Sequence, residues 1–110
     1  DMLRVGGENV AALEIETAIS ATGLVMECAV VAQKHYMLGD VPAAFVRLNE
    51  AGRDLTEEEV SNRIVAHCRE QLADFKVPRS VHIVDDFPRS TLDRIAKKKL
   101  REQLPPIESG

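Results

Sequence analysis

The chain has 110 residues, of which 45% are hydrophobic and 29% charged, and its formal net charge is −4. This length suits one small domain, and the negative charge argues against general binding to nucleic acid, so any basic site must be local. Because no segment is apolar enough to cross a bilayer and no signal peptide precedes the first expected strand, we expect a cytoplasmic protein without a membrane span.

The N-terminal half predicts a hairpin, a helix and two strands. Gly6-Gly7 permits positive φ at a tight hairpin turn. The apolar residues that follow recur at helical spacing as far as Gly23, a natural helix stop. A β-branched apolar run and an alternating segment then predict the strands. These four elements are expected at residues 2–10, 12–22, 25–31 and 42–48.

The C-terminal half predicts a third strand between two helices. Thr56 and Glu59 have the spacing of a capping box, in which each side chain satisfies a backbone N–H at the start of a helix. Ser90 and Asp93 have the same spacing and predict the last helix, which the two prolines after Leu104 end. The expected elements are a helix from 56 to 72, a strand at 80–85 and a helix from 90 to about 104.

The order of these elements predicts an α+β fold. It cannot build a large parallel sheet, and it suits a small three-stranded sheet with flanking helices and an N-terminal β-hairpin. We expect residues 1–104 to form the domain and residues 105–110 to be a disordered tail.

The sequence predicts no metal site. Its three histidines are scattered one per segment, and its two cysteines lack the spacing of metal ligands. Cys28 and Cys68 lie in segments that look buried, and we expect both to be core thiols.

Cationic residues would share one face of the predicted last helix. They are Arg94, Lys97, Lys98 and Arg101, with apolar residues on most of the opposite face. This pattern is typical of a solvated basic face, and it also fits contact with an anionic partner or a cofactor phosphate. Charge alone favours the solvated face.

Short motifs follow one another in a fixed order along nearly the whole chain. They occupy residues 1–10, 13–16, 29–31, 39–46, 55–59, 75–79 and 86–89. In sequence, order and spacing these motifs resemble the C-terminal domain of adenylate-forming acyl-CoA synthetases. Agreement of several motifs is a far more specific signal than any one of them.

The resemblance implies an acid–CoA ligase (AMP-forming) of which this chain is one part. Such enzymes join a carboxylic acid to ATP, giving an acyl-adenylate and pyrophosphate, and then transfer the acyl group to coenzyme A. The small C-terminal domain is a mobile lid that rotates between these half-reactions. The enzyme's own N-terminal domain holds most of the ATP, magnesium and acid contacts, so we expect the isolated domain to be inactive and its sequence to leave the acid unidentified.

The resemblance also assigns site residues. Gly6 and Gly7 would line the tunnel for the pantetheine arm of coenzyme A, where the missing Cβ atoms allow close approach. Glu8 would face the joined active site, or else bond to nearby backbone at the end of the hairpin. Counting forward from 88–89 places Arg94 at the family's catalytic lysine and Asp93 at the glycine before it.

The replacement of Gly-Lys by Asp93-Arg94 leaves three alternatives open. Arg94 substitutes for the lysine, or the enzyme adenylates poorly and keeps thioester formation, or the protein is a noncatalytic interaction module. Because Asp93 loses glycine's access to positive φ and completes a capping box with Ser90, we expect the last helix to begin a turn earlier than in relatives.

Overall fold

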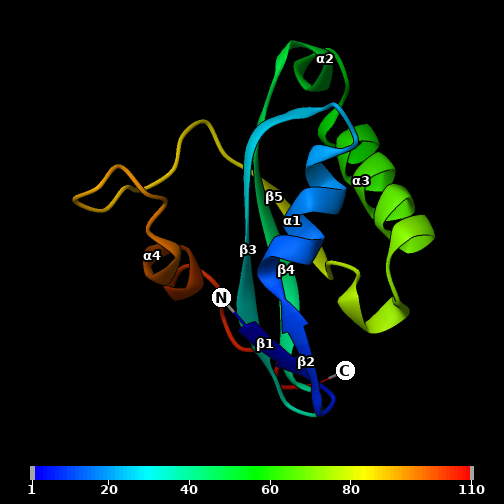
Figure 1. The fold of residues 1–110 in the computed structure, drawn as a ribbon, viewed down its shortest axis with the longest axis vertical. Helices are drawn as coiled ribbons and strands as arrows, with labels where there is room; N and C mark the ends of the chain where they lie inside the picture. The colour runs from blue at the N-terminus through cyan, green and yellow to red at the C-terminus, as the bar shows by residue number, and fades with distance from the viewer. Residues whose placement is uncertain (1, 110) are drawn as a thin grey trace.

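A five-stranded sheet forms the centre of the computed structural model, which describes residues 2–109 (Figure 1). In chain order the elements are β1 (Met2–Val5), β2 (Glu8–Ala11), α1 (Ala12–Ser20), β3 (Val25–His35), β4 (Gly39–Leu48), α2 (Glu50–Arg53), α3 (Glu57–Gln71), the short 3₁₀ helix η1 (Asp74–Lys76), β5 (Ser80–Ile83) and α4 (Lys97–Glu102). The predicted α+β class is confirmed.

The sheet is larger than predicted because its central hairpin is longer. β3 and β4 pair antiparallel from Val25↔Leu48 to His35↔Gly39, well beyond the apolar runs that predicted them. The start of β4 therefore reaches β1, where Val5 pairs with Gly39, and the N-terminal hairpin joins the sheet instead of standing apart. β5 runs parallel to β4 and completes the five strands.

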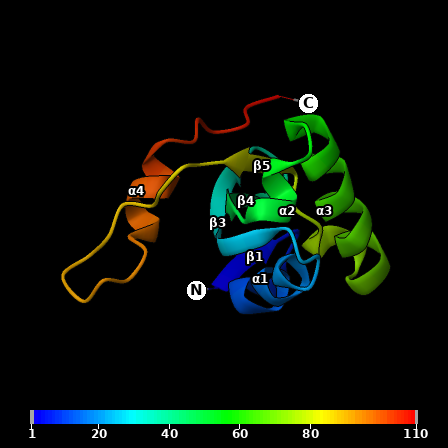
Figure 2. The same cartoon turned by 90° about the horizontal axis from the view of Figure 1, so that it is seen from above.

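Helices cover both faces of this sheet, with α1 and α3 on one face and α4 on the other (Figure 2). Side chains alternate between the faces along each strand. Val30 and Val46 join the core under α1 and α3, whereas Ala29, Val31 and Phe45 join the core under α4. This double burial explains why both strands are rich in apolar residues.

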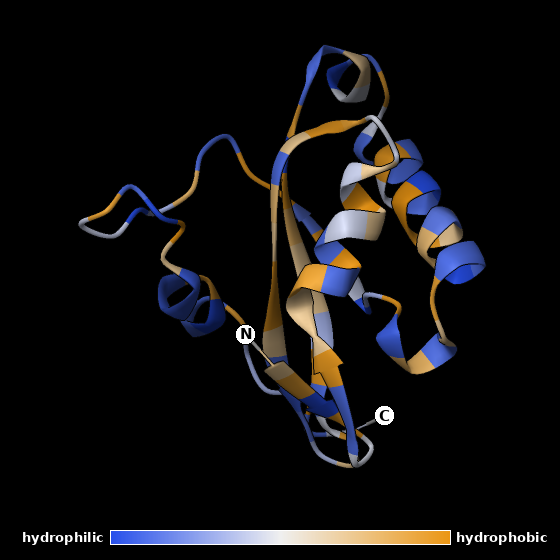
Figure 3. Cartoon of the chain, viewed as in Figure 1, coloured by the Kyte–Doolittle hydropathy of each residue, from blue (hydrophilic) through white to orange (hydrophobic). Residues whose placement is uncertain are grey.

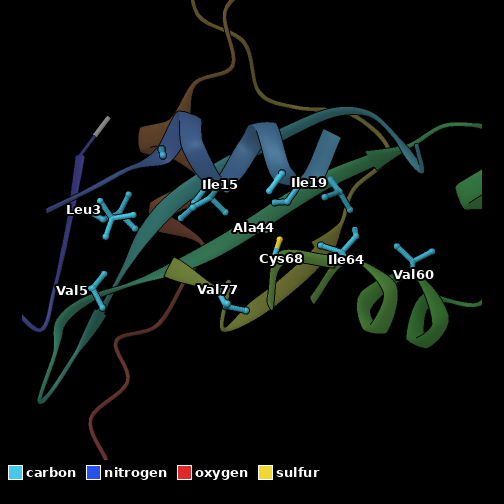
Figure 4. Packing of buried hydrophobic residues seen from close by; sticks show 14 residues of the cluster. Leu3, Val5, Ile15, Ile19, Ala44, Val60, Ile64, Cys68 and Val77 are labelled. Atoms are coloured by element: carbon cyan, nitrogen blue, oxygen red, sulfur yellow. The ribbon is translucent and has the colours of Figure 1, made fainter. Parts of the chain in front are cut away.

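The larger core lies between the sheet and the α1–α3 pair (Figure 4). Ile15 and Ile19 from α1 meet Ile64 and Cys68 from α3, and all four side chains are fully buried. The predicted start of α3 is confirmed. Thr56 Oγ1 accepts from the Glu59 N–H at 3.1 Å, and Glu59 Oε1 accepts from the Thr56 N–H at 2.9 Å.

The opposite face has a smaller core, in which Phe87 and Leu100 are buried against the sheet. The predicted helix over 90–104 is wrong at both ends, because the structure confines α4 to Lys97–Glu102.

The segment after α4, which we expected to be disordered, makes hydrogen bonds along β3. The Ile107 N–H donates to the Lys34 carbonyl and the Ile107 carbonyl accepts from the Tyr36 N–H, both at 2.8 Å. Gln33 Nε2 also donates to the Pro105 carbonyl at 2.8 Å.

Candidate functional site

Residues 84–96, here named the Arg94 loop, project from the sheet between β5 and α4 (Figures 1 and 2). Figure 3 shows that this stretch is mostly hydrophilic, in contrast to the strands beside it. The loop closes as a narrow turn. The Ser90 N–H donates to the Arg94 carbonyl at 2.8 Å, and the Ala96 N–H donates to the Pro88 carbonyl at 2.7 Å.

Asp93 explains why this segment is a loop and not the predicted helix. Its φ is 58°, in the left-handed region, where a right-handed helix cannot continue. Aspartate tolerates that region better than most residues with a side chain. The expectation that Asp93 would cap an earlier helix start is therefore wrong. Asp93 keeps the backbone conformation that a glycine at this position would adopt freely.

Arg94 follows this turn with an exposed side chain. Its neighbour Leu92 is 73% exposed, so the outer part of the loop offers both a cation and an apolar side chain to a partner surface. The structure thus places the predicted catalytic residue where it can meet another molecule. Arginine is a planar fork that binds carboxylate or phosphate oxygens in pairs, whereas lysine is a compact point charge.

Ion pairs at the base of the loop form a second part of the site, which the sequence analysis missed. Arg89 Nη2 donates to both carboxylate oxygens of Glu27 on β3, at 2.8 and 3.0 Å, and Arg47 Nη1 donates to Glu27 Oε1 at 3.0 Å. The hydrogen bond from Arg89 is the main cause that lowers the pKa of Glu27. The signal in the sequence was a glutamate inside the otherwise apolar run 25–31.

The predicted basic face does not form as one surface, because Arg94 lies outside α4. Lys97 is the first residue of α4, and its Nζ lies 2.8 Å from Glu16 Oε2 on α1. Glu16 Oε2 also accepts from the Val30 N–H at 2.8 Å. Lys97 is therefore part of the attachment of α4 to the fold, whereas Lys98 is exposed.

The glycine turn between β1 and β2 is exposed, as its predicted role requires. Gly6 and Gly7 have φ of 58° and 89°. A residue with a side chain would be strained in this backbone conformation, whereas glycine adopts it freely. A Cβ on Gly6 would come 3.5 Å from Leu38, whereas one on Gly7 would meet open space. The turn borders a pocket of about 420 Å³ that is lined by Arg4, Gly6, Gly7, Lys34, Met37, Leu38, Gly39 and Asp40.

Glu8 is exposed at the start of β2, directly after this turn. Among residues 2–109 the structure gives its side chain no hydrogen bond or ion pair, so nothing described supports the alternative in which Glu8 bonds to nearby backbone.

The glycine turn and the Arg94 loop lie apart on the domain. In Figure 1 the turn is at the lower end of the sheet, whereas the loop extends to one side, and Figure 2 also shows the loop projecting away from the strands. The structure therefore does not combine the predicted residues into one site. It presents two exposed surfaces.

The cysteines and histidines give no further site in the described part of the chain. Cys68 is buried, and burial raises the pKa of its thiol to about 11, whereas Cys28 is only partly buried, with its pKa raised for the same reason. Residues 2–109 contain no group of three or more potential metal-ligating His, Cys, Asp or Glu side chains. No described helix is long and apolar enough to cross a membrane.

Comparisons with known proteins find a matching family and similar structures. The family model of the AMP-binding enzyme C-terminal domain matches residues 14–94. The 3-[(3aS,4S,7aS)-7a-methyl-1,5-dioxo-octahydro-1H-inden-4-yl]propanoyl:CoA ligase of Rhodococcus jostii (strain RHA1) is 41% identical over 103 residues, which are 94% of this chain and 19% of the relative.

Solved structures are similar over the same range. Apo MatB from Rhodopseudomonas palustris is 35% identical, with a TM-score of 0.83 over 94% of this chain and 20% of that one. An ATP-bound chimera, RpMatB-BxBclM B1, is 36% identical, with a TM-score of 0.87 over 99% of this chain and 21% of that one. The chain thus spans about a fifth of the length of the relatives it matches.

Proposed function

Because the chain belongs to the AMP-binding enzyme C-terminal domain family, we propose that it is the moving domain of an ATP-dependent acid–CoA ligase. One observation carries this proposal. Asp93 holds φ at 58° and Arg94 is exposed directly after it, so the cation stands on a projecting turn and not on the side of a helix. Such a turn can enter a pocket of a neighbouring domain.

In the adenylation half-reaction, Arg94 would lie against the acid's carboxylate and the oxygens of the nucleotide phosphate. The guanidinium would stabilise negative charge that develops as the acyl–phosphate bond forms. ATP supplies the adenylyl group, and the N-terminal domain would hold most of the nucleotide together with its magnesium. The part played by this chain is to deliver a fixed positive charge at the end of the Arg94 loop.

In the thioester half-reaction, the glycine turn would face the same active site. Gly6 and Gly7 carry no side chain into the pocket beside them, so a thin pantetheine arm could pass close to their backbone. Glu8 would present its carboxylate at the mouth of that path, since its side chain is exposed. Coenzyme A supplies the thiol that takes the acyl group.

The separation of these two surfaces supports a rotation between half-reactions. The glycine turn and the Arg94 loop lie at different places on the domain, so one active site would meet them in turn if the domain reorients (Figure 1). The alternative of a noncatalytic interaction module rested on the loss of the Gly-Lys pair. No observation favours it. Asp93 has a φ that a glycine would adopt freely, and Arg94 carries a positive charge as a lysine would.

We also propose the cytoplasm as the location. The two cysteines of the chain are unpaired, which fits a reducing compartment. A fusion of the enzyme to a fluorescent protein in its own host cell, with cell fractionation beside it, tests this directly.

The experiment that tests the function uses the full-length protein with its native N-terminal domain. Acid-dependent exchange of pyrophosphate into ATP measures adenylation, and acyl-CoA formation measures thioester transfer, each with a panel of aliphatic and aromatic acids. We expect both activities with at least one acid, and neither activity from residues 1–110 alone. Absence of both activities from the full-length protein with every acid would contradict the proposal.

A further inference from the structure

We propose that Glu27 and Arg89 are positioning residues that hold the Arg94 loop in place for adenylation, an inference that rests on the proposed function. The Arg94 loop leaves the sheet after β5 and returns at α4, and its outer residues are exposed. A loop of this kind presents a catalytic cation accurately only if its base is fixed to the rigid part of the domain.

Contacts within the sheet hold Glu27 in place independently of the loop. A bulge lies between Val25 and Glu27 on β3, and Glu27 pairs with Arg47 on β4 in the strand register. Arg47 Nη1 donates to Glu27 Oε1 at 3.0 Å across the two strands. Bulges redirect side chains at the ends of strands. The carboxylate of Glu27 is thus held on the loop's side of the sheet.

Arg89 connects this carboxylate to the loop at several points. Its Nη2 reaches both oxygens of Glu27, at 2.8 and 3.0 Å, and also lies 3.6 Å from Asp86 Oδ1 near the start of the loop. Its Nε lies 3.9 Å from Asp93 Oδ1, beside the left-handed turn. Arg89 therefore links the sheet, the loop's entry and the residue that precedes Arg94.

The surroundings make this link more than an ordinary surface ion pair. The side chains of Glu27 and Arg89 are 28% and 29% exposed, so water screens their charges less than on an open surface. Phe87 is buried in the core under α4 and fixes the chain two residues before Arg89. Arg89 is also bridged to Ile95, one residue beyond Arg94. Movement of Arg89 would therefore move the turn that carries Arg94.

The test compares Glu27→Gln with Arg47→Met in the full-length ligase. Glu27→Gln removes the charge that holds Arg89, whereas Arg47→Met removes the other partner of Glu27 and leaves the link to the loop. We expect Glu27→Gln to lower pyrophosphate exchange roughly 10- to 100-fold, because a small misplacement of a catalytic group costs that much. Thioester formation from a prepared acyl-adenylate should stay within about twofold of wild type.

Amide hydrogen exchange gives a second readout that needs no ligase activity. The N–H groups of Ser90 and Ala96 are hydrogen-bonded inside the loop. Glu27→Gln should lower their protection on the order of tenfold, and Arg47→Met, which keeps the pair of Glu27 with Arg89, should lower it by less. Arg89→Met should lower protection at least as much as Glu27→Gln, because it also removes the contacts with Asp86 and Asp93. The double variant should be no worse than Arg89→Met alone, because the pair with Glu27 is already lost in that variant.

Two results would overturn the inference. One is unchanged protection of Ser90 and Ala96 in Glu27→Gln. The other is an equal loss of both half-reactions, which would indicate a general structural role. A wild-type enzyme without either half-reaction would instead contradict the proposed function, and the exchange data would still decide whether Glu27 anchors the loop.

Discussion

On one face of the sheet, α1 and α3 completely bury Ile15, Ile19 and Ile64, whereas on the other face the Arg94 loop depends on Phe87 and on the ion pairs of Glu27. Apolar burial involves no charge that salt can screen or acid can titrate, whereas ion pairs weaken in both salt and acid. The comparison teaches that the domain keeps its stable core away from its projecting cation. The loop can then move, or change its residues, without unfolding the core under α1 and α3.

The largest expected effect comes from breaking the packed face. Ile15 is 0% exposed and Leu13 is 71% exposed on the same helix, so the two give a matched pair. We expect Ile15→Ala to lower the free energy of unfolding by about 2–5 kcal/mol and Leu13→Ala by less than about 1 kcal/mol. Urea denaturation followed by circular dichroism measures both. Equal losses would show that α1 does not pack as described.

A smaller effect is expected at the turn of the loop. Asp93 has φ of 58°, a region that costs a residue with a side chain about 1–2 kcal/mol and costs glycine little. We therefore expect Asp93→Ala to be less stable than Asp93→Gly by about 1 kcal/mol, measured by urea denaturation. If Asp93→Ala is the more stable variant, the segment has helical φ and the described loop is wrong.

The smallest expected effect is a local response to pH. The hydrogen bond from Arg89 holds the pKa of Glu27 below its ordinary value of 4.5. A lowered carboxylate pKa stabilises the folded state above the ordinary value and loses that contribution as the pH falls through the lowered one. Protection of the Ser90 and Ala96 amides, corrected for the intrinsic exchange rate, should therefore fall below about pH 4.5.

The control for this pH response lies in the sheet. Ala44 is fully buried in β4 and depends on apolar packing, so its amide should keep its protection over the same range. A parallel loss at Ala44 would indicate general acid unfolding in place of a release of the loop.

The packed face was predictable because regular periodicity decides its structure. Helical spacing of apolar residues predicted α1, and the capping box of Thr56 and Glu59 predicted the start of α3. The strands were found from their apolar runs, but their length was underestimated. The polar ends of β3 and β4 are stabilised by pairing with each other and with Val5, and pairing of distant residues leaves no local pattern.

The loop side was less predictable because single residues decide its structure. Ser90 and Asp93 have the spacing of a capping box, yet the left-handed φ of Asp93 and the hydrogen bond from Ser90 to Arg94 give a turn. The ion pair of Glu27 with Arg89 spans 62 residues in sequence, so no local motif could indicate it. The two exposed surfaces were found through resemblance, which carries the long-range information that local patterns lack.

The most direct test of the two-surface account measures the half-reactions separately in full-length Arg94→Ala and Gly7→Val variants, with Lys98→Ala as the control for loss of an exposed cation. We expect Arg94→Ala to lower pyrophosphate exchange about 100- to 1000-fold and to spare thioester formation from a prepared acyl-adenylate. We expect Gly7→Val to lower thioester formation and to spare pyrophosphate exchange, because the valine side chain would enter the open space beside the turn. Equal loss of both half-reactions in the two variants would contradict the account.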